Sequence, residues 1–441
     1  MSELAGKNAV VLGLARSGEA AARALLEAGS AVTVLDAADE IAQRDRAARL
    51  PDARVVLGQT DPGDVAQADL VVASPGVPWS SPWIEAALAR GIPVWSEVEL
   101  AFRLGIRPLV GITGTNGKTT TTEMTVAALR AAGRDAVAAG NVGTPLVSFP
   151  AGGEIVAELS SFQLQGIADF HVPVAVLLNV AHDHLDWHGS DEAYRRAKAR
   201  IFENQTDADV AIVHDDEGSR SIAEGAATQI LFADDRLPPD GAGVEDGWIV
   251  VPQGRVVDVS LLRARGRPNR SDAIAAAAAA CALGADPVTV GEALAAFEPR
   301  AHRIEFIAVI DGVTYVNDSK ATDPHATLAA LEGMTGVVLI AGGRNKGIDL
   351  SELAAAAPSL RAVVAIGESA PEIDAAFAPS GVPVEKAGSM EDAVARARDL
   401  SVPGDTVLLS PATASFDMYR NYEERGDAFR AAVRRIEGSD L

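Results

Sequence analysis

The segment Val110 to Thr121, VGITGTNGKTTT, constrains the fold more than any other part of the chain. A short apolar run leads into a loop in which Gly114 and Gly117 let backbone N–H groups turn inward, and Lys118 and Thr119 follow. This pattern is typical of a strand, a phosphate-binding loop and a helix whose positive N-terminus faces the same anion. Lys118 then supplies a charge for the phosphates, and the Thr119 hydroxyl is placed to hold Mg²⁺. A glycine-rich turn without a ligand is disfavoured by the strand and helix patterns on either side.

The length and charge of the chain limit what it can do. A chain of 441 residues suggests about three domains, and 48% hydrophobic with 22% charged residues is ordinary for a soluble globular protein. The net charge of -23 argues against binding to nucleic acid or an anionic membrane, and no apolar run approaches the ~18 residues of a membrane span. The one cysteine, Cys281, fits a reducing compartment. We therefore expect a cytoplasmic protein, by default a monomer, that binds neither nucleic acid nor membrane.

The N-terminal part of the chain begins with a strand, a helix and a second strand. The first strand covers residues 8–14, and the second ends at Asp36. The turn GLARSG at residues 13–18 is close to the dinucleotide fingerprint GxGxxG, but Ala15 stands where a glycine would let a pyrophosphate approach. NAD is therefore disfavoured, and a nucleotide sugar stays possible. A later strand ends in a loop at residues 74–76 that is placed like a ligand loop, although a plain Pro-Gly turn explains it almost equally.

Strand and helix patterns alternate through the rest of the chain. Apolar strands at 154–159 and 174–178 extend the sheet of the phosphate loop, residues 207–260 suggest an antiparallel appendage, and an alanine-rich helix follows at 271–283. The last third repeats strand and loop, which predicts a parallel sheet with helices on both faces. Ligands of such sheets lie beyond the carboxyl ends of the strands. The residues that this rule singles out are Asp318, Lys320, Arg344, Lys346 and Ser415.

Polar residues just beyond two buried strands suggest metal or phosphate chemistry. Glu158 ends the strand EIVAEL and, beside a phosphate loop, is a candidate Mg²⁺ ligand. His182, His184 and His188 follow the next strand. Without cysteines a zinc site is disfavoured, and one histidine that binds Mg²⁺ or substrate fits better. For His182 and His188, a plain exposed position is an equal alternative.

The helix at residues 190–202 carries four basic residues in an acidic protein. Such a run is usually a solvated face. Tyr194, Lys198 and Ile201 nevertheless share one face at i, i+4, i+7 spacing, which places Lys198 between two large side chains. A semi-buried lysine has a lowered pKa and can react with CO₂.

Eight motifs, in the correct order and spread over essentially the whole chain, resemble those of the Mur ligases of peptidoglycan precursor synthesis. The motifs are TGTNGKTTT, GNVGTP, AELSSFQL, LNVAHDHLD, YRRAKARIF, AHRIE, NDSKATDP and SPATASFDMYRNYEERG.

The resemblance implies an α/β protein of three domains. Residues 1–98 would form a Rossmann-like domain for a UDP substrate, 99–300 a P-loop ATPase-like domain with a mixed sheet, and 301–441 a mobile Rossmann-like domain for an amino acid. The implied reaction is the ATP-dependent addition of D-glutamate to UDP-N-acetylmuramoyl-L-alanine through an acyl phosphate. An L-glutamate-adding variant and a folylpolyglutamate synthase-like ligase are the nearest alternatives. A nicotinamide-dependent oxidoreductase is disfavoured by Ala15 and by the second nucleotide loop at Lys118. A P-loop switch is disfavoured because Lys198, His184 and Lys346 would have no role in it.

The resemblance also implies roles for individual residues. ATP would be bound by Gly114, Thr115, Asn116, Gly117, Lys118, Thr119, Thr120, Asn269, Arg303 and Asp318. The catalytic residues would be Lys118, His184, Lys198 and Lys320. Two Mg²⁺ ions would be held by Thr119, Glu158, His184 and Lys198, the last as a carbamate derived from CO₂. The UDP substrate would contact Ser17, Asp36, Ser74, Gly76, Asn141 and His184, and glutamate would contact Thr322, Lys346, Ser415 and Tyr422.

Two segments depart from the pattern of the family. Residues 268–272, PNRSD, keep only the first asparagine of an adenine-contacting motif HNxxN, so the resemblance assigns no adenine contact to Asp272. Alanines at positions 37 and 38 follow Asp36, so backbone groups are expected to recognise the uracil.

Overall fold

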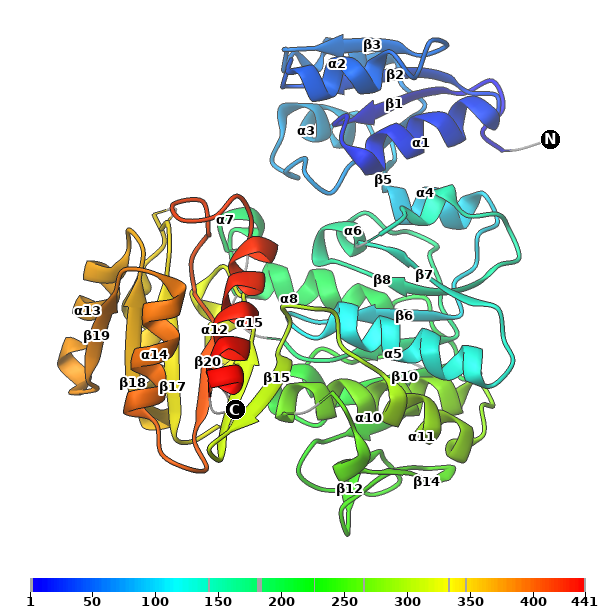
Figure 1. The fold of residues 1–441 in the computed structure, drawn as a ribbon. Helices are drawn as coiled ribbons and strands as arrows, with labels where there is room; N and C mark the ends of the chain where they lie inside the picture. The colour runs from blue at the N-terminus through cyan, green and yellow to red at the C-terminus, as the bar shows by residue number, and fades with distance from the viewer. Residues whose placement is uncertain are drawn as a thin grey trace. The chain divides into compact units, whose positions relative to one another are not determined.

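The chain divides into two compact units in the computed structural model (Figure 1). The first unit is Met1–Val259 with Asp272–Leu294, and the second is Ser260–Ser271 with Ala295–Leu441. The structure describes residues 3–141, 143–180, 185–225, 227–264, 266–331, 334–345 and 347–439. The domain boundaries expected after residues 98 and 300 stay predictions.

The N-terminal residues form a five-stranded parallel sheet with helices on both faces. Its strands are β1 (Asn8–Leu12), β2 (Ala31–Asp36), β3 (Arg54–Leu57), β4 (Leu70–Ala73) and β5 (Val94–Ser96). Its helices are α1 (Arg16–Glu27), α2 (Ile41–Ala47), η1 (Pro62–Gln67), α3 (Pro82–Leu88) and α4 (Glu97–Arg103). The strand order is β3-β2-β1-β4-β5. Ala9 and Val11 of β1 pack on the side of α1, whereas Val10 and Leu12 pack on the side of α3, which explains the continuous apolar run of this strand.

The central sheet has six parallel strands in the order β11-β10-β9-β6-β8-β7. They are β6 (Val110–Thr113), β7 (Ala136–Gly140), β8 (Glu154–Glu158), β9 (Val174–Leu177), β10 (Val210–His214) and β11 (Thr228–Phe232). The accompanying helices are α5 (Lys118–Ala131), η2 (Leu146–Ser148), α6 (Ser161–Gln165), α7 (Leu185–His188), α8 (Asp191–Ala199), η3 (Arg200–Phe202), α9 (Glu217–Arg220), α10 (Arg267–Ala282) and α11 (Pro287–Ala296). β6 lies between β8 and β9, so the loop that follows it leaves the sheet at a topological switch point.

The structure corrects two predictions for the central part. β10 and β11 belong to the parallel sheet, which is parallel in every described strand pair rather than mixed. Among the described residues of the expected appendage, 207–260, the strands that pair antiparallel form a separate sheet: β12 (Gly243–Glu245), β13 (Trp248–Val251) and β14 (Gly254–Asp258). The reason lies in the burial patterns. β10 has consecutive buried residues, as a strand covered on both faces requires, whereas burial alternates along β13, as in a sheet with one exposed face.

The alanine-rich helix α10 is a buried helix. Residues 273–280 are 0% exposed, so the alanines allow close packing from all sides. Cys281 follows and is buried, as expected, and burial raises the pKa of its thiol to about 11. Among the described residues, no helix combines the length and the apolar character needed to cross a membrane.

The second unit contains another six-stranded sheet, in the order β15-β16-β20-β17-β18-β19. Its strands are β15 (Glu305–Ile310), β16 (Val313–Asn317), β17 (Val337–Gly342), β18 (Leu360–Ile366), β19 (Val384–Ala387) and β20 (Thr406–Leu409). Its helices are η4 (Val259–Leu261), α12 (Pro324–Leu331), η5 (Leu350–Ser359), α13 (Ala370–Phe377), η6 (Ala378–Ser380), α14 (Met390–Leu400) and α15 (Tyr422–Ser439).

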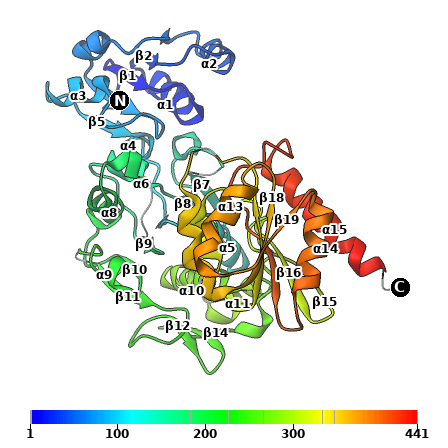
Figure 2. The same cartoon turned by 90° about the vertical axis from the view of Figure 1, so that its left-hand side faces the viewer.

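This sheet is parallel except for the hairpin of β15 and β16. α14 and α15 lie side by side on one face, whereas α13 and η5 bury residues against the other (Figures 1 and 2). The α/β class and the parallel sheets predicted from the sequence are therefore confirmed.

Candidate active site

The glycine-rich loop joins β6 to α5 as the sequence predicts. Gly117 caps the helix with φ 82°, a left-handed value that favours glycine. A Cβ atom at Gly117 would lie 2.2 Å from Oδ1 of Asp272, and one at Gly114 would lie 2.9 Å from Cβ of Leu178. Both glycines are therefore required by close packing as well as by backbone conformation.

Neighbouring elements fix the shape of this loop. Asn179, just after β9, accepts a hydrogen bond from the Thr115 N–H through its main-chain oxygen (3.0 Å) and one from the Asn116 N–H through Oδ1 (2.8 Å). The hydroxyl groups of Thr115 and Tyr194 are 2.9 Å apart. Asn179 begins the segment of the predicted histidines, but no role was predicted for it, although a polar residue at the end of an apolar strand is a usable signal. These contacts hold the loop in place.

Two lysine side chains converge on one carbonyl oxygen of the loop. The Lys118 ammonium donates to the oxygens of Gly114 and Thr115, both at 2.8 Å. The Lys198 ammonium also donates to the Gly114 oxygen at 2.8 Å. Two positive charges thus meet at the mouth of the loop, an arrangement that an anion would stabilise. A phosphate oxygen is a stronger acceptor for both groups than a carbonyl.

Lys198 reaches this position from the buried face of α8. Tyr194, Lys198 and Ile201 are all buried, which confirms the predicted face, and the Lys198 ammonium lies 4.7 Å from the centre of the Tyr194 ring. The other basic residues of the segment pair with nearby carboxylates, as a solvated face does: Arg195 with Asp191, Arg196 with Glu192, and Arg200 with Glu203. Of the four basic residues, Lys198 is the buried one, whereas Arg200 is half-buried and also donates to the main-chain oxygens of Gln165 and Ile167.

Glu158 is the buried carboxylate beside the loop. It ends β8, is 3% exposed, and accepts hydrogen bonds from the Thr119 hydroxyl (2.9 Å) and the Asn141 amide (3.0 Å). A hydroxyl and a carboxylate in contact are the hard oxygen donors that Mg²⁺ takes from proteins, and substrate phosphates and water complete its shell. Residues Thr119 and Glu158 therefore fit a Mg²⁺ ion. In the part of the chain that the structure describes, no group of three or more His, Cys, Asp and Glu side chains is placed to hold a metal.

The histidine cluster is only partly described. His182 and His184 lie outside the described residues. His188 is not a plain exposed residue, because its ring stacks on Phe162 with centroids 5.4 Å apart and its Nε2 lies 3.0 Å from the Ser161 hydroxyl. The packing of α7 against α6 explains this burial.

The predicted ligand residues of the N-terminal sheet meet at its carboxyl edge. Asp36 accepts hydrogen bonds from the N–H groups of Leu14 (2.5 Å) and Ala38 (2.8 Å), and the Ser74 hydroxyl donates to the Gly13 oxygen (3.0 Å). Asp36 thus fixes the backbone of two loops, the one after β1 and the one after β2. Ser17 is half-buried on the first turn of α1, and nothing lies within 4 Å of a Cβ atom built at Gly76.

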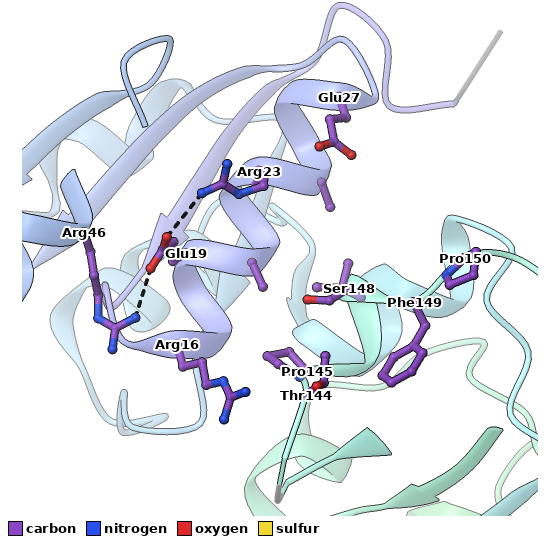
Figure 3. Close-up of a pocket in the computed structure, with 13 residues that line it drawn as sticks. Arg16, Glu19, Arg23, Glu27, Arg46, Thr144, Pro145, Ser148, Phe149 and Pro150 are labelled. Carbon is purple, nitrogen blue, oxygen red and sulfur yellow. Dashed lines mark hydrogen bonds and ion pairs between the residues drawn. The ribbon is translucent and has the colours of Figure 1, made fainter. Parts of the chain in front are cut away.

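Two cavities adjoin these loops within the first unit. A small pocket is lined by Ala73, Ser74, Pro75, Val77, Trp79, Ser96, Phe162 and Trp187. A larger cleft of about 730 Å³ separates α1 from residues 144–150 (Figure 3). Arg16 lies at one end of the cleft, and Glu19 is bonded to Arg23 and Arg46 along its rim. Hydrogen bonding from Arg49 is the main cause that lowers the pKa of Glu19 to about 2.

Several predicted residues of the second unit lie on loops at the carboxyl ends of β16 and β20, whereas Asn269 lies in α10 and Tyr422 begins α15. Asp318 accepts hydrogen bonds from the Ser410 hydroxyl (3.0 Å) and the Ile304 N–H (3.2 Å), and burial raises its pKa to about 7. The Lys320 ammonium lies 4.4 Å from the centre of the Tyr422 ring and 3.3 Å from its hydroxyl. Thr322 is half-buried, Ser415 and Asn269 are buried, and Lys346 lies outside the described residues.

Arg303 is presented by an unusual backbone segment. His302 and Ile304, on either side of it, have φ values of 67° and 45°. A left-handed conformation costs a residue with a Cβ atom roughly 1 kcal/mol, and more when the side chain is β-branched. The buried His302 ring, 3.0 Å from the Asn317 amide, anchors this turn. Arg303 is thereby held in one orientation relative to its own unit.

One residue that the sequence analysis did not single out is Arg425. It is 1% exposed, and it donates hydrogen bonds to Ser319, Gly342 and Thr413 on three loops of the second unit. Its only signal in the sequence is a cation inside the motif NYEERG, and nothing local shows that it is buried.

Comparison with known proteins places the chain in a family. Three family models match: the Mur ligase MurD-like N-terminal domain at residues 7–96, the Mur ligase middle domain at 112–234, and the Mur ligase glutamate ligase domain at 302–413. A UDP-N-acetylmuramoylalanine–D-glutamate ligase of Frankia casuarinae is 47% identical, over 98% of this chain and 95% of the relative. One of Geobacillus kaustophilus is 41% identical, over 98% of both.

The chain belongs to the Mur ligase family. Solved Mur-type ligases share the fold at low identity. A MurF ligase of Thermotoga maritima in complex with ADP has a TM-score of 0.58 at 16% identity, over 99% of this chain and 97% of that one. A pseudomurein peptide ligase type C of Methanothermus fervidus has a TM-score of 0.57 at 20% identity, over 98% and 100%. The Mur ligase resemblance stated from the motifs is confirmed, and the chain is an ATP-dependent, amide-bond-forming ligase.

Proposed function

We propose that this Mur ligase adds D-glutamate to UDP-N-acetylmuramoyl-L-alanine, with ATP, through an acyl phosphate. The observation that carries the ATP chemistry is the convergence of Lys118 and Lys198 on the Gly114 oxygen, beside the Thr119–Glu158 pair. The relatives named D-glutamate ligases, 41–47% identical over nearly the whole chain, support the choice of substrates.

The first half-reaction requires cations around a transferring phosphoryl group. The loop N–H groups and the N-terminus of α5 bind phosphate oxygens, and Lys118 neutralises charge on them. Thr119 and Glu158 would hold Mg²⁺, which, when bound, offsets the negative charge of the phosphates. The substrate carboxylate then attacks the γ-phosphorus, the bond to the β-phosphate breaks, and ADP leaves. Asn141, bonded to Glu158, is the group that we assign to orienting this carboxylate.

The second half-reaction forms the amide. The amino group of glutamate attacks the acyl carbon, phosphate departs, and the amine loses its proton. We assign Thr322, Lys346, Ser415 and Tyr422 to binding glutamate. We assign Arg303 and Asp318 to binding ATP, and Lys320 to catalysis. A site closed to water is needed, because water would otherwise hydrolyse the acyl phosphate.

Several finer points belong to the same proposal. We expect that His184 and a carbamate on Lys198 would hold a second Mg²⁺ ion, and the buried position of Lys198 favours its reaction with CO₂. We also propose a cytoplasmic monomer, in keeping with the single, buried cysteine. The UDP substrate would contact Ser17, Asp36, Ser74 and Gly76, on the edge of the N-terminal sheet.

The test is phosphate release from ATP with Mg²⁺, UDP-N-acetylmuramoyl-L-alanine and either enantiomer of glutamate, each component being omitted in turn. We expect release only with every component present and with D-glutamate. Release with L-glutamate alone would change the stereochemistry but keep the ligase. Release without the UDP substrate, or none with either enantiomer, would contradict the proposal.

A further inference from the structure

We infer that Arg425 is a positioning residue that holds three loops of the second unit in one arrangement and thereby sets the affinity for the incoming amino acid. The inference rests on the proposed function, because it takes these loops as the site of glutamate. Arg425 itself is assigned no contact with substrate.

All three nitrogens of the Arg425 guanidinium group donate hydrogen bonds. Nη2 donates to the Ser319 main-chain oxygen at 2.8 Å, and Nε donates to the Ser319 hydroxyl at 3.0 Å. Nη1 donates to the main-chain oxygens of Thr413 at 3.0 Å and Gly342 at 3.4 Å. Ser319 follows β16, Thr413 follows β20, and Gly342 is the last residue of β17. Arg425 belongs to α15, the helix that is drawn in red in Figure 1. Its side chain therefore connects the carboxyl ends of three neighbouring strands.

Two of these loops carry residues that the proposed function uses, and the third is hydrogen-bonded next to one of them, Ser415. Ser319 precedes Lys320, and its hydroxyl also donates to the Tyr422 main-chain oxygen at 2.8 Å. Thr413 is two residues from Ser415. Gly342 leads to Arg344, whose N–H donates to the Ala414 oxygen, while the Ala414 N–H donates in return. A shift at Arg425 would therefore move several ligand contacts together.

Gly343 packs closely against the guanidinium group of Arg425. Gly343 has φ 140°, and a Cβ atom there would lie 2.2 Å from the Ala414 oxygen and 3.1 Å from Nη1 of Arg425. The arginine is 1% exposed, and burial lowers its pKa to about 10, which still leaves it charged at neutral pH. Carbonyl oxygens that lose such a donor stay buried and unpaired, a state that drives local rearrangement.

Lysine cannot replace this group fully. It places a single ammonium where a planar fork spans four acceptors, so it can satisfy some of them but not hold all three loops. Methionine keeps the volume of the stem and removes every donor. Arg425→Lys therefore removes some of the hydrogen bonds to the three loops, and Arg425→Met removes all of them. Arg435→Met is a matched control, because Arg435 is an exposed arginine on the same helix, paired with Glu391.

The test compares Arg425→Lys, Arg425→Met and Arg435→Met with the unaltered chain in two measurements. The first is amide hydrogen exchange at Arg344 and Ala414, whose N–H groups donate to each other's main-chain oxygens, and at Lys320, whose N–H donates to the His302 oxygen. The second is the KM for D-glutamate, for ATP and for the UDP substrate. We expect faster exchange at these amides in both Arg425 variants, and a KM for glutamate raised about tenfold or more in Arg425→Lys, with the other two KM values within about twofold.

The outcomes separate this inference from the proposed function. An inactive unaltered chain would defeat the proposed function, while the exchange measurement would still test the bracing. A folded Arg425→Lys protein with unchanged exchange and an unchanged KM for glutamate would overturn the inference. An equal rise in all three KM values would overturn it too, because it would show a general loss of structure. If Arg425→Met does not fold, Arg425→Lys decides.

Discussion

The phosphate loop of the first unit and the loops around Arg425 in the second both form hydrogen bonds with side chains of other elements, but they differ in how much of their shape consecutive residues encode. The phosphate loop is contiguous, and its shape depends on two glycines and on Asn179 after the neighbouring strand. The loops of the second unit depend on an arginine more than eighty residues from two of its three partners. Consecutive residues thus encode the turn of the first loop, which Asn179 supports from a distant segment, whereas Arg425 is distant in sequence from two of its three partners.

The largest effect is expected from the substitution that removes the lysine charge of the phosphate loop. Lys118→Ala should lower D-glutamate-dependent phosphate release by about 10³-fold or more, because a charge that acts on the transferring phosphoryl group is lost. Steady-state phosphate release measures the effect. Lys386→Ala, at an exposed lysine paired with Asp374, is the control and should keep full activity. Substantial activity in Lys118→Ala would show that the loop does not act as assigned.

Substitution of Lys198 tests whether catalysis at the phosphate loop also requires a residue that is distant in sequence. Lys198→Ala should lose activity by about 10²-fold or more and be partly rescued by short carboxylic acids, which replace a carbamate. Arg196→Ala, at an exposed pair with Glu192, should behave like the unaltered chain. An active Lys198→Ala enzyme that carboxylic acids do not affect would exclude the carbamate.

Gly117 offers a matched test of close packing. Gly117 and Gly133 both have φ +82°, but a Cβ atom at Gly133 meets nothing within 4 Å. Gly133→Ala should cost roughly 1 to 2 kcal/mol of stability from backbone strain alone, without loss of activity. Gly117→Ala should cost more, because its Cβ atom would lie 2.2 Å from Asp272, and should lower phosphate release by about 10²-fold. Equal behaviour of the two variants in thermal unfolding and in activity would contradict the packing argument.

The smallest effect concerns Asp318 in the second unit. Burial raises its pKa to about 7, whereas the unfolded carboxyl loses its proton near its ordinary value of 3.8. The stability that this group contributes is therefore complete at low pH, falls as pH rises from about 4 to about 7, and is level above that. The difference in unfolding free energy between the unaltered chain and Asp318→Asn should decrease across this window, by at most a few kcal/mol. Glu97, whose pKa burial also raises to about 7, cancels in that difference. A difference that stays constant between pH 5 and pH 8 would argue against a protonated Asp318.

The sequence predicted the features that local chemistry determines. The strand, loop and helix around Lys118, the inward face of α8 and the α/β class follow from glycine spacing and hydrophobic periodicity. The pairing of β10 and β11 was missed because an apolar run of five residues does not say which strand it will join. Arg425, Asn179 and the left-handed turn at His302 were missed for a related reason, since only the assembled sheet brings their partners together.

The central claim is that this site transfers a phosphoryl group from ATP to the carboxylate of the UDP substrate before glutamate reacts. Its most direct test uses UDP-N-acetylmuramoyl-L-alanine labelled with heavy oxygen in that carboxylate, in a complete reaction with D-glutamate. We predict that the released phosphate carries one labelled oxygen from the substrate, measured by mass spectrometry or phosphorus NMR. Phosphate that takes its new oxygen from water instead would contradict the acyl phosphate and the roles assigned to the loop.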